Sequence, residues 1–289
     1  MLSSHAEGAR LAGILLALAS AAAQGFTFLF SKVALGELNT RTFVFFWMFS
    51  AGLYATLGSL PHRHHTRSLN RYAWFLLIVT GLFNVISSYF FFTAINLSPQ
   101  PALVSFLGQL TIIPSIAVSV LVLKEKITRS AALGIFVLLT GTVFLTYVSG
   151  SIGWQLLALA SAFSLVNGLQ LLTNKLAAAT VRPVVIVAAR AWISSIGAFI
   201  FFAGALGLPS ANTWLVLAAG AFFGPFLSFV LFYSALHKVE AWIVASLSTA
   251  VPLFAAVYDA VLLGRPMTTL ELLAGLLVVL GAFQISSAR

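Results

Sequence analysis

One arginine lies within an apolar stretch of the chain, where a charge is costly unless it is paired. Arg190 follows Pro183 by about 11 Å along a helix, at about 1.5 Å per residue. Its guanidinium can hold a substrate carboxylate through paired hydrogen bonds. A structural role is the simpler interpretation, and a third is that the long side chain extends to the polar end of the helix.

Asp259 is the second ionisable residue within such a stretch, about one helical turn from its end. Lys32, Arg41 and Arg265 flank other apolar stretches on the same predicted side. An ion pair between Asp259 and one of them would form an outer gate. An interfacial charge without a gating role is the alternative.

Uncharged polar side chains recur at helical spacing in the apolar stretches. Ser20, Gln24, Thr27 and Ser31 are separated by four, three and four residues, which places them on one helical face. Such faces predict a central cavity with hydrogen-bonding groups for a polar substrate. With Arg190, the predicted substrate-binding residues are Gln24, Thr27, Asn84, Ser88, Gln109, Asn167, Ser228 and Thr249.

The same residue types also join packed helices in a membrane, which is the alternative for each of them. For a single serine or threonine, contact between helices is the simpler interpretation. An amide has four hydrogen-bonding sites to satisfy, and this favours the cavity for Gln24, Asn84, Gln109 and Asn167.

Three prolines fall inside apolar stretches. Pro114, Pro225 and Pro252 each remove a backbone hydrogen bond and so kink a helix. We predict a gating role for them together with Asp259. Static curvature is the alternative.

Other kinds of site have no support in the sequence. The chain has no cysteine, and the apolar stretches hold no set of histidines and carboxylates for a metal. They also lack a charged couple or an activated nucleophile. We predict no metal, no cofactor and no enzymatic activity, and we interpret His62-Arg63-His64-His65 as a basic anchor.

The amino-acid composition indicates whether the folded chain is surrounded by water or by lipid. Hydrophobic residues make up 61% of the 289 residues and charged residues 7%, which is too little charge for a water-soluble fold. A bilayer accepts such a chain as helices, because a helix satisfies its own backbone. Ten apolar runs of about 20 residues are long enough to span it. They cover residues 11–31, 42–60, 73–95, 101–123, 130–148, 152–172, 183–206, 212–234, 241–263 and 268–286.

The basic residues behind the net charge of +9 sit in the connections between these runs. Eleven Lys and Arg residues fall on one predicted side and three on the other, which predicts that both termini are cytoplasmic. No basic face remains for a nucleic acid. The run at residues 11–31 resembles a signal peptide, but its recurrence in mid-chain predicts a retained span.

The chain contains an internal repeat. Residues 15–21 and 156–162 have the same sequence, and Thr128 and Gly141 recur 140 positions later as Thr268 and Gly281. Residues 1–149 and 150–289 therefore form two units of five spans each. Because five is odd, the second unit is inverted relative to the first. The predicted fold is an all-α polytopic membrane protein with ten transmembrane helices in two inverted five-helix repeats.

The glycine, proline and acidic positions of these units resemble the drug/metabolite transporter superfamily, in particular its ten-span carriers with two EamA-type halves. These positions are Pro252, Leu263-Gly264, Gly275 and Gly281, echoed by Leu123-Lys124-Glu125, Gly134 and Gly141. The resemblance covers nearly the whole chain. It departs at Arg265, where the family usually has a glutamate, which Glu125 keeps in the first half.

The resemblance implies a secondary transporter in a bacterial cytoplasmic membrane that exports an amino acid or a related amphipathic compound by alternating access. No carboxylate lies at mid-membrane, so we expect no tight proton coupling. A nucleotide-sugar, sugar-phosphate, vitamin or nucleoside carrier of the same fold is the closest alternative. A membrane-embedded enzyme and a passive channel are alternatives from other classes. The glycine positions predict close helix packing, within the chain or at a homodimer seam.

Overall fold

The protein is described by a computed structural model that covers residues 2–62, 69–98, 104–105, 107–122, 124, 128–148, 153–262 and 268–287. All regular structure within these ranges is helical, as predicted. Seven helices of the described chain are long and apolar enough to cross a membrane. They span Gly8–Leu35, Thr40–Ser59, Arg71–Leu97, Trp154–Ala178, Pro183–Ala205, Ala211–Leu236 and Ile243–Leu262.

The other three predicted spans are helical where the structure describes them. They correspond to η2 (Gly108–Thr111) with α6 (Ile112–Leu121), to α7 (Arg129–Val148) and to α14 (Thr269–Ser287). The count of ten membrane crossings stays a prediction.

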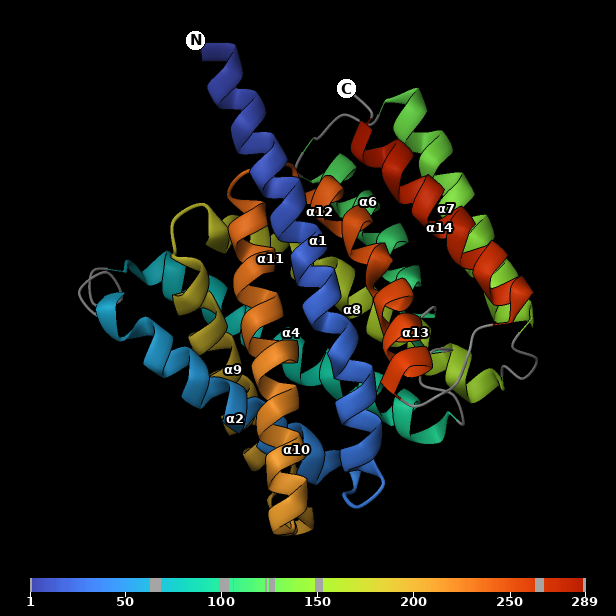
Figure 1. The fold of residues 1–289 in the computed structure, drawn as a ribbon. Helices are drawn as coiled ribbons and strands as arrows, with labels where there is room; N and C mark the ends of the chain where they lie inside the picture. Colours follow the sequence, from blue (N-terminus) through green and yellow to red (C-terminus); the bar gives the residue numbers. More distant parts are fainter. Residues whose placement is uncertain are drawn as a thin grey trace.

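Helix α1 (Leu2–Leu35) runs through the middle of the bundle (Figure 1). It packs against α13 (Val251–Leu262) and against the irregular helix formed by α10 (Ala211–Ala221), the π-helical η4 (Phe222–Ser228) and α11 (Phe229–Leu236). On one side of α1 lies the pair α2 (Thr40–Ser59) and α9 (Pro183–Phe202), and on the other lies the pair α7 and α14.

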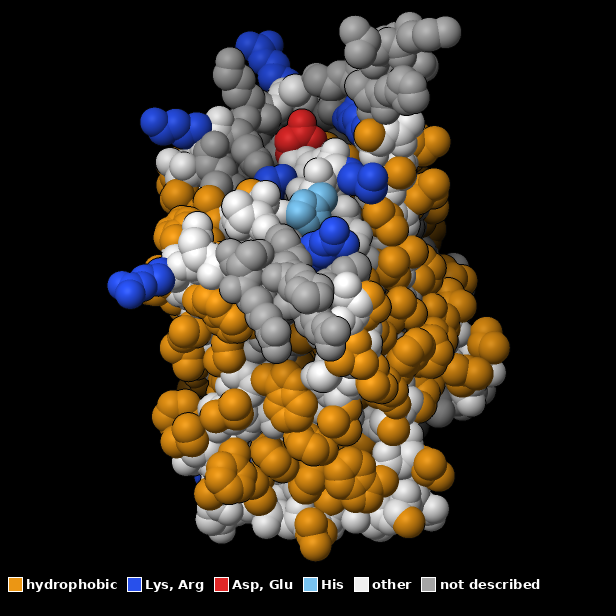
Figure 2. All heavy atoms as spheres, turned by 90° about the vertical axis from the view of Figure 1, so that its left-hand side faces the viewer, with side chains coloured by type: hydrophobic (Ala, Val, Ile, Leu, Met, Phe, Trp, Pro, Cys, Tyr) orange, Lys and Arg blue, Asp and Glu red, His pale blue; other side chains and the backbone are white. Residues whose placement is uncertain are grey.

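The remaining helices complete the wall around the centre. Helix α4 (Arg71–Leu97) packs against α8 (Trp154–Ala178), which in turn packs against α6. Helix α12 (Ala241–Leu247) continues through the 3-10 turn η5 (Ser248–Ala250) into α13, and a second such turn, η3 (Ala203–Ala205), follows α9. A broad apolar belt covers the face in Figure 2, while Lys and Arg gather toward the end where Figure 1 shows both termini.

Polar caps set the starts of several helices. The side chain of Asn39 accepts a hydrogen bond from the Thr42 amide (2.9 Å) at α2, and Asn70 accepts one from Ala73 (2.8 Å) at α4. Ser210 caps α10 in the same way. Each cap satisfies one of the backbone donors that a helix leaves free in its first turn.

Helix boundaries recur at the spacing of the sequence repeat. Helices α1 and α8 end at Leu35 and Ala178, 143 positions apart, and α2 and α9 begin with the same offset. Helices α4 and α10 begin at Arg71 and Ala211, 140 positions apart, and α7 and α14 also begin 140 positions apart. Residues related by these offsets are called matched positions below.

Two lysines at matched positions make the same kind of contact. Lys32 Nζ donates to the backbone carbonyls of Ser98 (2.7 Å) and Ile95 (3.4 Å) at the end of α4. Lys175 Nζ donates to the carbonyls of Leu236 (3.1 Å) and Val239 (2.9 Å) at the end of α11. Each ammonium satisfies carbonyls that have no partner within their helix and lies at its negative end.

Two glycines at matched positions permit close helix crossings. A Cβ atom on Gly168 would lie 2.5 Å from Pro114 Cβ, and one on Gly25 would lie 3.0 Å from Phe254 Cβ. Pro114 and Phe254 are themselves 140 positions apart. The pairs α6–α8 and α1–α13 therefore cross in corresponding ways. Gly281 lies against the α7 backbone, so this glycine packs within the chain.

Candidate functional site

A cavity of about 190 Å³ lies at the centre of the bundle. Residues of α1, α2, α4, α8, α9, α11, α12 and α13 form its wall, together with the irregular segments η2, η4 and η5. An apolar cavity of about 150 Å³ is large enough to hold benzene. The cavity therefore suits a molecule about as large as one ring with a short polar chain.

Most of the predicted binding residues lie on this wall. They are Gln24, Thr27, Asn84, Ser88, Asn167, Arg190 and Thr249. Gln109 belongs to η2, but its side chain lies outside the described part of the structure. A role of these residues in binding substrate stays a prediction.

Ser228 is not among the residues that line the cavity. It is buried, and its hydroxyl donates to the carbonyl of Gly224, as occurs where a serine bonds back within its own helix. The Ser228 carbonyl accepts a hydrogen bond from Ser20 Oγ (2.8 Å). In the structure, Ser20 and Ser228 thus join α1 to η4, which corresponds to the helix-contact interpretation.

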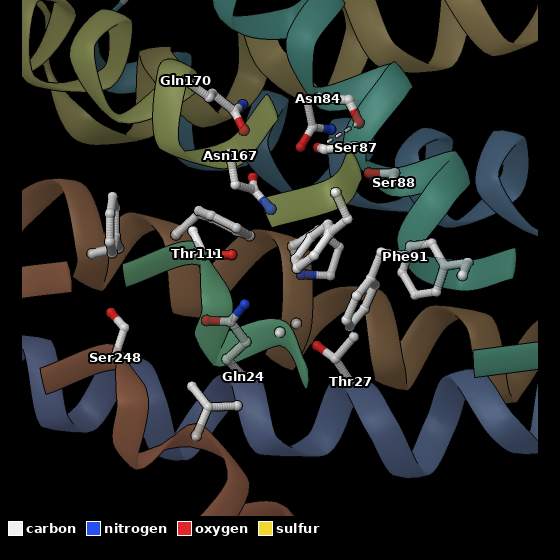
Figure 3. A pocket seen from close by; sticks show the side chains of 18 of the residues that line it. Gln24, Thr27, Asn84, Ser87, Ser88, Phe91, Thr111, Asn167, Gln170 and Ser248 are labelled. Atoms are coloured by element: carbon white, nitrogen blue, oxygen red, sulfur yellow. Dashed lines mark hydrogen bonds between the residues drawn. The ribbon is translucent and has the colours of Figure 1, made fainter. Parts of the chain in front are cut away.

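Two amides from opposite sides of the cavity point into the same space. Figure 3 shows Gln24 reaching up from α1 and Asn167 reaching down from α8, with Thr111 between them. Neither amide has a hydrogen-bond partner within the described chain. Gln24 and Asn167 are at matched positions, so each half supplies one amide for a polar ligand.

Arg190 is 7% exposed and does not extend to the end of its helix, so the third interpretation of this residue is wrong. Its Nε donates to Asn84 Oδ1 (2.7 Å), and Nη2 donates to the same oxygen. Its Cζ atom lies 3.4 Å from the ring centroid of Phe229, a cation–π contact. Helix α9 thus holds a positive charge on the cavity wall.

Asn84 has a different environment from the one expected of a free amide. Its Oδ1 accepts from Arg190, and its Nδ2 donates to Ser194 Oγ (2.8 Å). The Ser194 hydroxyl in turn donates to the carbonyl of Gly81 (3.2 Å). Asn84 lines the cavity, but its hydrogen bonds go to the protein and fix the guanidinium.

Aromatic side chains complete the wall, and sequence reasoning missed the most deeply buried of them. Trp47 and Met48 of α2 line the cavity although no binding residue was expected there. The rings of Phe91 and Phe163 stack at 4.9 Å between centroids, with 30° between their planes. The repeat held a signal for Trp47, because it is the matched position of Arg190.

The prolines lie beside irregular helical segments. Pro225 is inside the π-helical η4 and lines the cavity. Pro114 lies in the first turn of α6, which follows η2, and Pro252 lies in the first turn of α13, which follows η5. Such segments often mark hinges. The gating role of the three residues stays a prediction.

The outer-gate ion pair of Asp259 also stays a prediction. Asp259 is in α13 and is not among the residues that line the cavity. Lys32 donates to backbone carbonyls, and Arg41 lies 6.0 Å from the ring centroid of Phe202. Arg265 lies outside the described residues, as does Glu125. The described chain holds no group of three His, Asp or Glu residues that could bind a metal.

Comparisons with known proteins relate both halves of the chain to one family. The model of the EamA-like transporter family matches residues 11–147 and again residues 152–287. A protein of Salmonella typhimurium named a probable amino-acid metabolite efflux pump is 27% identical over 213 residues, which are 67% of this chain and 70% of that protein.

A solved crystal structure shares the fold. It is 18% identical in sequence and superposes with a TM-score of 0.77 over 97% of this chain and 98% of its own. The double match to one family agrees with the matched helix boundaries. The chain belongs to the EamA-like transporter family, with two EamA halves, and is a membrane transporter of small metabolites.

Proposed function

We propose that this protein exports an amino acid or a closely related amphipathic compound by alternating access between two inverted five-helix halves. The observation that carries the proposal is the cavity wall, which the two halves build from matched positions. These pairs are Gln24 with Asn167, Thr27 with Gln170, Trp47 with Arg190, Asn84 with Gly224, and Thr111 with Val251.

A cavity between two equivalent halves provides the geometry that alternating access needs. When such halves rock against each other, one site opens first to one face of the membrane and then to the other. The irregular segments η2, η4 and η5 all touch the cavity, so bending there changes access to it.

The charge distribution supports the proposed orientation. Lys and Arg residues gather toward the end of the molecule that carries both termini (Figures 1 and 2). Such an excess of basic residues is typical of the cytoplasmic side. We assign that end to the cytoplasm of a bacterial inner membrane.

The contents of the cavity favour exchange or facilitated diffusion. No Asp or Glu is among the described residues that line it, so these residues provide no carboxylate for a proton relay. The volume of about 190 Å³ also favours a small metabolite over a nucleotide-sugar.

Counterflow into proteoliposomes tests the transport proposal. Vesicles loaded with unlabelled phenylalanine, leucine or serine are diluted into the labelled amino acid, and saturable accumulation is expected for at least one of them. Empty vesicles are the control. Conductance without saturation would indicate a channel, and loss of uptake on dissipating the pH gradient would contradict uncoupled exchange.

The inverted arrangement can be tested by labelling, because the natural chain has no cysteine. Gly8 and Gly153 lie near the starts of α1 and α8, at matched ends of the two halves. A membrane-impermeant maleimide applied to intact cells should label Gly153→Cys and leave Gly8→Cys unlabelled until the cells are opened. Labelling of both, or of neither, from outside would contradict the inversion.

A further inference from the structure

The guanidinium of Arg190 has one nitrogen that the protein does not use. Nε and Nη2 donate to Asn84 Oδ1, and the ring of Phe229 covers one face. Nη1 is buried and has no hydrogen-bond partner in the described chain. A buried charged donor without a partner is costly, so its retention needs an explanation.

No neighbouring group of the described chain lies in hydrogen-bonding geometry with Nη1, although Tyr233 interacts electrostatically with the guanidinium. Asn84 is oriented by its bond to Ser194, which directs Oδ1 to the other two nitrogens. The hydroxyl of Tyr233, which also lies close to the guanidinium, donates to Asn174 Oδ1 (3.0 Å). The guanidinium is therefore held through two of its nitrogens, and Nη1 is left without a hydrogen-bond partner in the described chain.

The charge of the cavity indicates what the partner is. Arg190 is the only charged side chain among the described residues that line the cavity. One fixed positive charge in a small, partly apolar space favours a ligand with one negative charge. A carboxylate fits a single guanidinium edge, whereas a phosphate dianion needs more cations than the wall provides.

The rest of the wall indicates what the ligand carries besides the carboxylate. Trp47 and the stacked Phe91 and Phe163 provide flat apolar surfaces. The amides of Gln24 and Asn167 provide further hydrogen bonds in the same space (Figure 3). An aromatic ring with a short polar chain is compatible with both surfaces and with the volume.

We propose that Arg190 Nη1 binds the carboxylate of the transported compound, and that the protein selects small aromatic carboxylates over the corresponding amides and amines. This inference rests on the proposed function, since it assigns the substrate class of the same cavity. Asn84 is the positioning residue of this site, because it touches the guanidinium and holds it in place.

Matched ligand pairs test the assignment without any mutation. Thermal shifts of the detergent-purified protein are measured over a concentration series of phenylalanine, phenylalaninamide, benzoate and benzamide. Each acid differs from its amide mainly in charge at one group. We expect the acids to bind at least about tenfold more tightly, in the range given by one hydrogen bond to a charged group. Equal binding of acid and amide, or no shift with either acid, would overturn the proposal.

Variants of the protein then show which residue causes the preference for the acid over the amide. Arg190→Gln should reduce the acid-to-amide ratio to about one, while Arg71→Gln, which removes an exposed arginine at the start of α4, should keep it. Asn84→Leu should lower the ratio partly, because the guanidinium loses the bonds that orient it. If Arg190→Gln kept the full preference for the acid over the amide, the assignment of the carboxylate site to Arg190 would be overturned. If Arg190→Gln does not fold, the acid-to-amide ratios of Arg190→Lys and of the wild-type protein decide whether Arg190 binds the carboxylate.

Comparing the binding of benzoate and phenylalanine with the counterflow of amino acids distinguishes this inference from the proposed function. Binding of benzoate and phenylalanine with no counterflow of any amino acid would support the Arg190 site and contradict amino-acid transport. Counterflow of amino acids that proceeds equally well with their amides would support transport and contradict the Arg190 site.

Discussion

Arg190 and Trp47 occupy matched positions in the two halves, yet they create opposite environments. Arg190 of α9 bonds to Asn84 of the other half, while Trp47 of α2 packs against Gly224, the matched position of Asn84. The same helix crossing thus holds a cation with an amide on one side and an indole with a glycine on the other. A duplicated scaffold acquires a polar end and an apolar end through two residue differences, which is what an amphipathic ligand requires.

The apolar end depends on space that only glycine leaves. A Cβ atom on Gly220 would lie 2.5 Å from Trp47, and one on Gly224 would lie 2.5 Å from Thr27 Oγ1. Such contacts are tighter than packed side chains accept. An asparagine at position 224 is therefore excluded while Trp47 and Thr27 keep their places, and the two ends cannot be exchanged by one substitution.

The largest effect is expected when the apolar end is removed. Trp47→Ala deletes a side chain that is 1% exposed, which should cost about 3–5 kcal/mol of stability. Trp47→Phe should retain most of it. The measurement is the free energy of unfolding in detergent. If Trp47→Ala left the free energy of unfolding unchanged, the indole would not stabilise this end of the cavity.

A smaller effect should follow when the matched glycine crossings are filled. Gly168→Ala brings a Cβ atom to 2.5 Å from the rigid ring of Pro114, and overpacking of this kind costs about 1–3 kcal/mol. Gly25→Ala should cost less, because its shortest contacts are 2.9 and 3.0 Å.

Gly204→Ala is the control for both glycines, since nothing lies within 4 Å of the added atom. Melting temperatures of the three variants, compared side by side, check the order. If Gly25→Ala were the most destabilising, the crossings would not be limited by these contacts.

The matched lysines should give nearly equal losses. Lys32→Met and Lys175→Met each remove hydrogen bonds from an ammonium to carbonyls at a helix end, worth about 1–2 kcal/mol in a partly buried setting. The thermal stability of both variants checks this. A loss confined to one variant would show that only one half relies on its lysine.

The smallest effect concerns an acid that only one half possesses. Hydrogen bonds from Thr213 and Ser210 lower the pKa of Glu37 below its ordinary value of 4.5, against a smaller opposing effect of burial. Its matched position is Thr180. Because the pKa is lowered on folding, the contact stabilises the protein above about pH 4.5, and this contribution is lost as the pH falls through the lowered value.

Glu37→Gln should therefore melt slightly below the wild type at pH 6 and at the same temperature at pH 3. Melting temperatures over this range provide the measurement. A difference that is independent of pH would mean that the carboxylate charge does not contribute.

Much of the fold follows from the sequence because membrane helices are strongly constrained. The apolar runs that became α2, α4 and α9 were predicted to within a few residues, whereas α1 begins nine residues earlier and α8 ends six residues later than predicted. Of the four residues that helical spacing placed on one face of α1, Gln24 and Thr27 line the cavity, whereas Ser20 and Ser31 are not among the residues that line it. Helical periodicity suffices there, since a polar face in an apolar helix has only the interior to point to.

The contacts between helices could not be predicted in this way. The sequence gives no indication that Asn84 uses its amide on Arg190 and Ser194, or that Ser228 bonds back to Gly224. The π-helical turn at Pro225 changes which residues of that span face the centre, and regular helical spacing does not include it.

The sequence by itself determined that this chain is a helical membrane protein built from two copies of one unit, because composition, run length and repeat spacing are local properties. Only the tertiary structure decided which polar side chains satisfy one another and which remain for a ligand. That division depends on distances of about 3 Å between helices far apart in the chain. Among the described residues that line the cavity, it left Arg190 Nη1 and the amides of Gln24 and Asn167 without a hydrogen-bond partner.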